Sequence, residues 1–361
     1  MKKQLLLAGA ALTLGLAGCS DNVTENLSNP IQTGEEIVFG STINNGEYQK
    51  ANGIQTKTIY AERIDHGIPV LWDPEGDEIA IVCPQALGNT KRADYLVKPD
   101  TTTTNWNQSG SVAKLDPSQT LKWGEEDAHK FFAFYPQNAS ILKDYAIEGE
   151  NVNFTISLPA TQNPTGWHTK TDENTQETTI YEIPNMDYAL MWAYNKVYKS
   201  KLQGKSIDLD FKNFVTVLDI TIPGPKNEHD AVTINNIVIS PTDPSQQLTG
   251  DFKATIIPPS ATAHHDIASM KLSTPTPNEA HRQISISCVN KDNQGITLKH
   301  NEKLVIKAYL CPKIENYNLD TEKINLSFRI STNKETLTIN HVPTHITNSK
   351  VNRILLPNIK P

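Results

Sequence analysis

Apolar and polar residues alternate in short stretches along much of the chain. The clearest case is residues 152–158, where Val152, Phe154, Ile156 and Leu158 share one side of an extended backbone. A period of two residues predicts β-strands that bury one face. Helical periodicity is nearly absent from the second half of the sequence. We therefore expect an all-β protein.

Other apolar stretches of strand length follow one another, separated by turns rich in Pro, Gly and Asn. Such spacing is typical of β-sandwiches. Residues 187–198 suit either a helix or a strand, and the polar residues 161–179 predict a loop. The remaining strands are expected at residues 37–39, 79–83, 131–135, 207–211, 214–222, 232–240, 248–252, 284–289, 304–311, 324–330, 337–339 and 351–356.

The first nineteen residues form a segment of a different kind. Lys2 and Lys3 precede a mostly apolar run, and the small residues Ala17 and Gly18 stand directly before Cys19. This order resembles a bacterial lipoprotein signal, in which residues 1–18 are removed and Cys19 is lipidated. An ordinary signal peptide that ends near a Cys by chance is the alternative. Residues 19–34 are polar and predict a flexible tether.

The length of the chain predicts two domains. It has 361 residues. The roughly 340 residues that follow such a signal are more than a single domain with one hydrophobic core usually contains. The polar, Lys-rich stretch 199–206 separates two sets of predicted strands, which places the domains at residues 35–200 and 201–361. The net charge of −7 argues against nucleic acid as a partner, because that partner needs a basic surface.

No catalytic or cofactor-binding motif stands out. The sequence has no Gly-rich phosphate loop, nucleophile elbow or His-Glu-x-x-His, so we expect neither an enzyme nor a cofactor. Two groups resemble metal ligands, but a polar loop and an acidic turn are the favoured interpretations, because metal sites need several converging ligands. The two groups are His264, His265 and Asp266, and Asp73, Glu75, Asp77 and Glu78.

The cysteines and tryptophans leave alternatives open. With Cys19 lipidated, the three others cannot all pair: Cys288 and Cys311 form a disulfide if their strands are neighbours, and are otherwise buried free thiols like Cys83. Exposed aromatic rings stack on sugars, so four tryptophans raise the alternative of a glycan-binding surface, whereas rings packed over sheet edges are the simpler interpretation. They are Trp72, Trp106, Trp123 and Trp167.

Several motifs, in this order, resemble the fimbrillin family of Bacteroidetes, the subunits of type V pili. A lipoprotein signal precedes a first apolar strand, a Trp-turn-strand and an aromatic strand that ends in Tyr-Pro. A strand of alternating pattern follows at the predicted domain junction, and a Leu-x-Gly-x-aromatic strand comes later. In this sequence the motifs are 37–39, 72–79, 131–136, 209–214 and 248–252. Together they cover nearly the whole chain after Cys19.

The resemblance implies two tandem transthyretin-like Greek-key β-sandwiches without enzymatic activity. It also implies assembly by donor-strand exchange, in which a protease cuts after Lys or Arg and removes the first strand. The candidate cleavage residues are Lys50, Lys57 and Arg63. The expected partners are other pilus subunits, the outer membrane through the lipid anchor, and a host protein or glycan.

The role within a pilus stays open between a stalk, tip or anchor subunit. Residues 351–356 near the end of the sequence suit either an internal strand or a donated one. A surface lipoprotein that binds glycans without polymerising is the alternative function.

Overall fold

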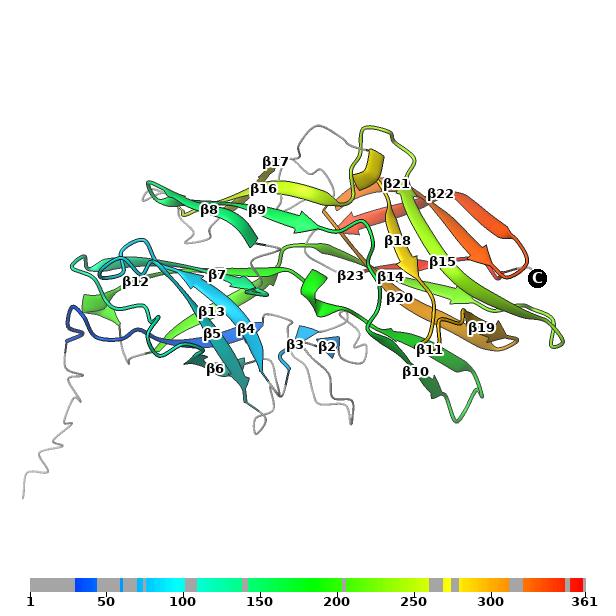
Figure 1. Cartoon of the computed structure of the whole chain (residues 1–361), viewed down its shortest axis with the longest axis horizontal. Helices are drawn as coiled ribbons and strands as arrows, with labels where there is room; N and C mark the ends of the chain where they lie inside the picture. Colours follow the sequence, from blue (N-terminus) through cyan, green and yellow to red (C-terminus); the bar gives the residue numbers. More distant parts are fainter. Residues whose placement is uncertain are drawn as a thin grey trace, which may run out of the picture. The chain divides into compact units, whose positions relative to one another are not determined.

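The computed structural model describes residues 30–43, 59–60, 70–73, 76–100, 109–137, 142–202, 206–259, 269–273, 279–311, 321–347 and 351–359. The helical elements in these ranges are three short 3-10 turns, η1 (Met186–Tyr188), η2 (Lys199–Lys201) and η3 (Glu279–His281). No helix in the described ranges is long and apolar enough to cross a membrane. The all-β prediction is confirmed (Figure 1).

Seven strands close into a barrel, and the first strand completes it. This strand, β1, pairs in parallel with one neighbour, β13, and antiparallel with the other, β6. In the order in which they pair, the barrel strands are β1 (Val38–Ile43), β13 (Ser206–Asn213), β12 (Met191–Tyr198), β7 (Ala128–Tyr135), β4 (Asp77–Val82), β5 (Arg92–Pro99) and β6 (Ser109–Lys114).

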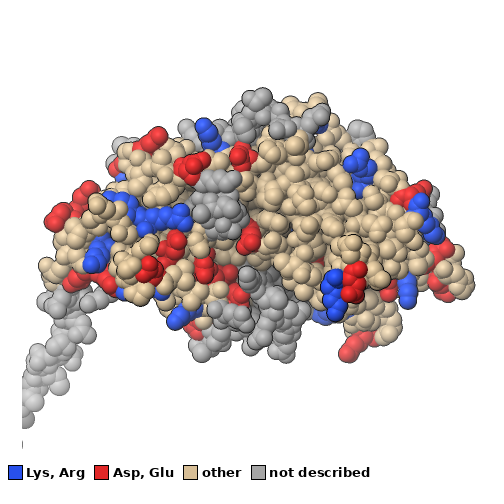
Figure 2. All heavy atoms as spheres, in the orientation of Figure 1, with Lys and Arg blue, Asp and Glu red and all other residues tan. Residues whose placement is uncertain are grey.

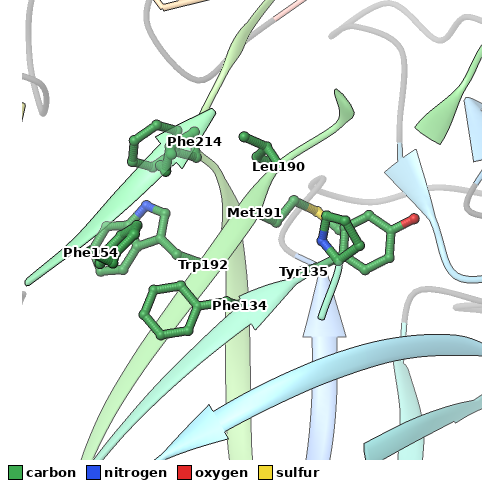
Figure 3. Close-up of a pocket in the computed structure, with 9 residues that line it drawn as sticks. Phe134, Tyr135, Phe154, Leu190, Met191, Trp192 and Phe214 are labelled. Atoms are coloured by element: carbon green, nitrogen blue, oxygen red, sulfur yellow. The ribbon is translucent and has the colours of Figure 1, made fainter. Parts of the chain in front are cut away.

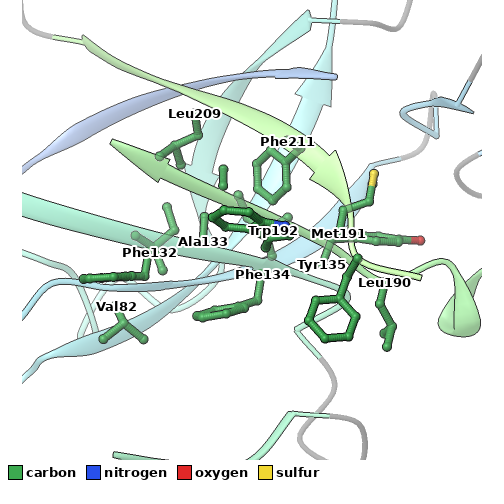
Figure 4. Packing of buried hydrophobic residues seen from close by; sticks show 14 of the residues in the cluster. Val82, Phe132, Ala133, Phe134, Tyr135, Leu190, Met191, Trp192, Leu209 and Phe211 are labelled. Carbon is green, nitrogen blue, oxygen red and sulfur yellow. The ribbon is translucent and has the colours of Figure 1, made fainter. Parts of the chain in front are cut away.

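Strand β7 is apolar on both faces because both of its faces are buried. The Phe131 ring contacts Phe39 of β1 edge to face at 5.4 Å. The opposite face of β7 carries Phe134. Its ring lies 4.7 Å from that of Phe154 in β9 (Asn151–Leu158), a strand of another sheet. Both faces of β7 are therefore covered, which accounts for the unbroken apolar run that predicted a buried strand. Figure 4 shows this packing around Phe132, Phe134 and Trp192.

The other described strands form three larger sheets and one small pair. A four-stranded sheet has the order β17-β16-β9-β8, and β2 (Ile59–Tyr60) pairs only with β3 (Val70–Leu71) in the described part of the chain. The strands that join β9 in its sheet are β8 (Leu142–Glu148), β16 (Gly250–Ile257) and β17 (Ser269–Ser273).

Two further sheets enclose a second apolar core. One is five-stranded and has the order β10-β11-β20-β14-β23, and the other has the order β18-β15-β21-β22, with β19 also paired to β15. Their bounds are β10 (Gly166–Thr171), β11 (Thr178–Ile183), β14 (Thr216–Pro223), β15 (Ala231–Pro241), β18 (Ile284–Ser287), β19 (Ile296–Lys299), β20 (Glu302–Leu310), β21 (Thr321–Thr332), β22 (Thr336–Thr347) and β23 (Val351–Leu355).

Buried apolar residues gather in two clusters. The first core cluster fills the barrel and its contact with β9 and β16, and the second core cluster lies between the two sheets that contain β14 and β15. The described residues from Ile31 onward form one compact unit. Strand pairing crosses the predicted boundary at residues 200 and 201, because β13 lies in the barrel and β9 pairs with β16. The boundary itself stays a prediction.

One local prediction needs correction, and one open alternative is decided in favour of a strand. Residues 161–179 contain β10, which the polar sequence concealed because the strand is an edge with three exposed residues, Thr169, Lys170 and Thr171. The ambiguous residues 187–198 are mostly strand: η1 ends at Tyr188 and β12 begins at Met191. The apolar spacing there was misleading because both faces of β12 are buried at its start, at Met191, Trp192 and Ala193.

Candidate functional site

Strand β1 is the best candidate for a functional element in the described part of the chain. Its alternate residues Phe39 and Ile43 are buried, whereas Val38 is 47% exposed. The ring of Phe39 lies 5.3 Å from Tyr95 and 5.4 Å from Phe131, both edge to face. Aromatic pairs in this geometry contribute beyond their buried area. The strand is therefore anchored by the buried side chains on one of its faces, Phe39 and Ile43.

The residues before β1 add a second set of contacts. Backbone hydrogen bonds run from Gly34 N to Trp123 O at 2.8 Å, from Ile37 N to Leu121 O at 3.0 Å and from Trp123 N to Glu35 O at 2.9 Å. The carboxylate of Glu36 accepts from Lys114 Nζ at 2.8 Å, an exposed ion pair of small energetic weight. Residues 34–43 thus form one continuous paired segment.

The outer side of β1 faces an open polar hollow. Its volume is about 450 Å³, and its walls come from β1, β5, β6 and β13. Gly40 lies beside the carboxylate of Asp208, and Ser41 Oγ donates to the backbone of Gly110 at 3.3 Å. Lysines and acidic residues are also interspersed over the face of the molecule seen in Figure 2. Strand β1 is therefore covered by core on one side only.

A small cavity also lies between the barrel and the four-stranded sheet. Figure 3 shows Phe134, Phe154 and Trp192 around it. Its volume is about 20 Å³, which is room for about one water molecule, and its lining is mostly apolar. This cavity is an imperfection in the packing between two sheets, and its size excludes a sugar or a cofactor.

Strand β23 pairs within its own chain, as an internal rather than a donated strand, and lies at the edge of the five-stranded sheet. It pairs in parallel with β14, and the backbone N–H of Leu356 donates to Thr221 O at 3.0 Å just beyond it. Ile354, Leu356 and Ile359 are buried, whereas Leu355 between them is 74% exposed. Of the two alternatives for residues 351–356, the structure therefore shows the internal strand.

A buried carboxyl group lies beside β20. Glu182 follows the four residues of β11 that pair with β20, and its Oε1 accepts from the backbone N–H of Lys307 at 2.5 Å. Burial raises the pKa of Glu182 to about 8, against a smaller lowering by Lys307. Lys307 Nζ in turn pairs with Asp219 at 3.0 Å. The ladder between β11 and β20 ends at Val305, and the side chain of Glu182 binds the backbone of β20 just beyond this point.

Nine of the residues singled out from the sequence fall outside the described ranges. They are Cys19, Lys50, Lys57, Arg63, Glu75, Trp106, His264, His265 and Asp266. Among the described residues, no group of three or more His, Cys, Asp or Glu could hold a metal ion. Asp73 N donates to Asp77 Oδ2 at 2.7 Å, and Gly76 N donates to Asp73 O at 2.9 Å.

The cysteine alternatives are now decided. Cys83, Cys288 and Cys311 are all buried free thiols. Burial raises the pKa of Cys83 to about 12, and the pKa values of the other two thiols are raised for the same reason. Neutral thiols are poor nucleophiles, so these residues serve packing.

The alternative of exposed tryptophans fails for two of the four, and the interpretation of packed rings holds for them. Trp72 and Trp123 are at most 2% exposed and pack edge to face against Phe211 and Phe131 respectively. Trp167 is half-buried against the second core cluster, and its Nε1 donates to Val289 O at 2.7 Å. None of these three rings offers a free platform for a sugar, which removes the main reason for the glycan-binding alternative.

Comparisons with known proteins give solved structures only. No family model matches the chain, and no curated protein matches it significantly. A "putative cell adhesion protein" of Bacteroides ovatus is 12% identical over 90% of this chain and 92% of its own, with a TM-score of 0.43. A second, from Bacteroides fragilis, is 11% identical over 91% and 94%, with a TM-score of 0.42.

A fimbrial protein of Bacteroides ovatus is also similar in structure. It is 11% identical over 91% of this chain and 50% of its own length, with a TM-score of 0.32. These three solved structures are thus described as cell adhesion and fimbrial proteins of Bacteroides.

Proposed function

We propose that the chain is a lipoprotein of the outer membrane surface and a structural or accessory subunit of a type V pilus with a role in adhesion. Cys19 carries the lipid, and other pilus subunits are the partners. Assembly proceeds by donor-strand exchange after proteolysis. The observation that carries this proposal is the position of β1, which closes the barrel between β13 and β6.

The pairing of β1 supports exchange for a physical reason. Removal of β1 would leave the backbone groups of β6 and β13 unpaired on both sides of one empty strand position. It would also expose the apolar site that Phe39 and Ile43 fill. An incoming strand with apolar residues two apart can restore both the ladder and the core. A strand of another subunit is such a partner.

The candidate cleavage residues follow β1 in the sequence. A cut after Lys50, Lys57 or Arg63 would separate β1 from the remaining strands of the barrel. The cut segment would then be held only by its ladder, by the contacts of residues 34–37 and by its buried side chains. Release of these contacts is the step at which a donor strand would enter.

The proposal is tested by trypsin cleavage of the lipid-free chain from Ser20, followed by electrophoresis with and without boiling. We expect a ladder that collapses only on boiling, with cleavage mapped by mass spectrometry to residues 44–69. The matched control carries Lys50→Ala, Lys57→Ala and Arg63→Ala together. It should stay monomeric under the same treatment, because β1 is then not released.

A second arm tests exchange without requiring this chain to donate a strand. The cleaved protein is mixed with a fluorescent peptide of residues 34–43, and retention of the peptide is followed by gel filtration. A peptide with Phe39→Asp and Ile43→Asp is the control. Retention of the first peptide alone supports the proposal. If neither a ladder nor peptide retention follows a mapped cut, the chain does not assemble by strand exchange.

A further inference from the structure

The connection between β9 and β10, residues 159–165, joins the two core clusters. Strand β9 places Val152, Phe154 and Ile156 in the first core cluster, and β10 places Trp167 against the second. Figure 1 shows this connection in green as it leaves β9 and enters β10. We call residues 159–165 the strap.

The strap pairs with β18 on one side. Ser285 N donates to Ala160 O at 2.7 Å, and Gln162 N donates to Ser285 O at 2.9 Å. The side chain of Asn163 accepts from Ser287 N at 3.1 Å. Through these three hydrogen bonds the strap lies along β18, the edge strand of the sheet that contains β15.

On its other side the strap reaches β20 through a single side chain. Gln162 Nε2 donates to Tyr309 O at 2.7 Å, and Gln162 Oε1 accepts from Tyr309 N at 2.8 Å. The ladder between β11 and β20 ends at Val305, so no residue of β11 pairs with Tyr309. One N–H and the carbonyl oxygen of the Gln162 amide bind Tyr309 as a backbone peptide group would, and Nε2 also donates to Pro159 O at 3.1 Å. The side chain thus takes the position beside Tyr309 that a residue of β11 would otherwise occupy.

Tyr309 is one of the residues at which the two clusters meet. Its ring belongs to the first core cluster and its hydroxyl lies 3.7 Å from Met186 Sδ, whereas its neighbours Ala308 and Leu310 belong to the second. Gln162 is 3% exposed, so its hydrogen bonds to Tyr309 are shielded from water. A buried backbone group that loses its partner is costly, which makes this contact hard to open alone.

We infer that Gln162 couples the two core clusters, so that the barrel and the sheets around the second cluster open as one cooperative unit. The strap binds β18 by its backbone and β20 by its side chain, while β9 is fixed on the barrel by the first core cluster. Opening of either cluster therefore requires the hydrogen bonds of Gln162 to break.

Hydrogen exchange in increasing urea tests this coupling. Residues 20–361 are labelled at each urea concentration, and peptides from β7 and β15 report the two clusters separately by mass spectrometry. The wild type should give coincident midpoints. Gln162→Met keeps the size of the side chain but cannot bind Tyr309, and should separate the midpoints by about 0.5–1 M urea.

Gln247→Met is the matched control. Gln247 is also buried, at 2% exposed, but its Nε2 donates to Thr249 O only two residues away, at 2.7 Å. This variant should keep the two midpoints together even if it lowers both. Coincident midpoints in Gln162→Met would overturn the inference. Separate midpoints in the wild type would also overturn it, and that measurement does not depend on any variant folding.

Discussion

At the scale of single residues, Glu182 is the side chain with the clearest energetic consequence. It is buried, its pKa is raised from an ordinary 4.5 to about 8, and burial is the largest cause. Between these two pH values the folded chain keeps a proton that the unfolded chain has lost. By linkage, the free energy of unfolding therefore falls as pH rises through this window.

We expect Glu182→Gln to remove this dependence. Relative to the wild type, the variant should gain stability from pH 5 to pH 8, by on the order of 1 kcal/mol per pH unit at most. Urea unfolding at pH 5, 6.5 and 8 measures the difference. A constant difference between the two proteins across these pH values would contradict the raised pKa of Glu182 in the folded chain.

Glu150→Gln is a suitable control for that experiment. Glu150 is exposed, and Lys130 lowers its pKa through a side-chain hydrogen bond and an ion pair. The stability that it contributes is present above the ordinary pKa of a glutamate and is lost only as pH falls below it. Its replacement should therefore shift stability equally at pH 5 and pH 8.

At the scale of elements, β1 offers a comparison between adjacent residues. Phe39 is 2% exposed and contacts two aromatic rings, whereas Val38 is 47% exposed. We expect Phe39→Ala to lower the free energy of unfolding by about 3–5 kcal/mol and Val38→Ala by less than about 1 kcal/mol. Urea titration of both variants measures this. Equal losses would mean that side-chain burial does not hold β1 in the barrel.

Strand β23 allows a similar comparison at the end of the sheet. Ile354 is 5% exposed and Leu355 is 74% exposed. Ile354→Ala should speed amide hydrogen exchange in β14 and β23 at least tenfold, because it removes about 2–5 kcal/mol of packing. Leu355→Ala should leave exchange within about twofold of the wild type. Equal rates in the two variants would show that β23 is not held by its buried face.

The strands that the sequence predicts best are those whose alternation matches burial. In β9 every second residue is buried, which is the pattern that predicted it. Strand β10 escaped prediction because its edge position leaves polar residues in the ladder, and β12 was ambiguous because it is buried on both faces at its start. Alternation of apolar and polar residues predicts a strand only where one face is buried and the other is exposed. Exposed edge strands and strands buried on both faces lack this alternation, so they are harder to predict.

The candidate site shows a stronger limit of sequence reasoning. The apolar residues 37–39 predicted a first strand, but nothing in them specifies β13 and β6 as its neighbours. Gln162 gave no signal at all, because its role depends on where β11 ends relative to Tyr309. Pairing between distant segments is a property of the tertiary fold, and one sequence does not reveal it.

At the scale of the whole molecule, the order of residues in the barrel has a consequence for synthesis and export. Strand β1 begins at Val38 and its parallel neighbour β13 begins at Ser206. A chain that emerges from its N-terminus must therefore hold its first strand unpaired on this side until more than half of the sequence has appeared. Pairing of strands so far apart in the sequence is intrinsically slow. Until it occurs, the apolar strand β1 is exposed and can associate with other chains.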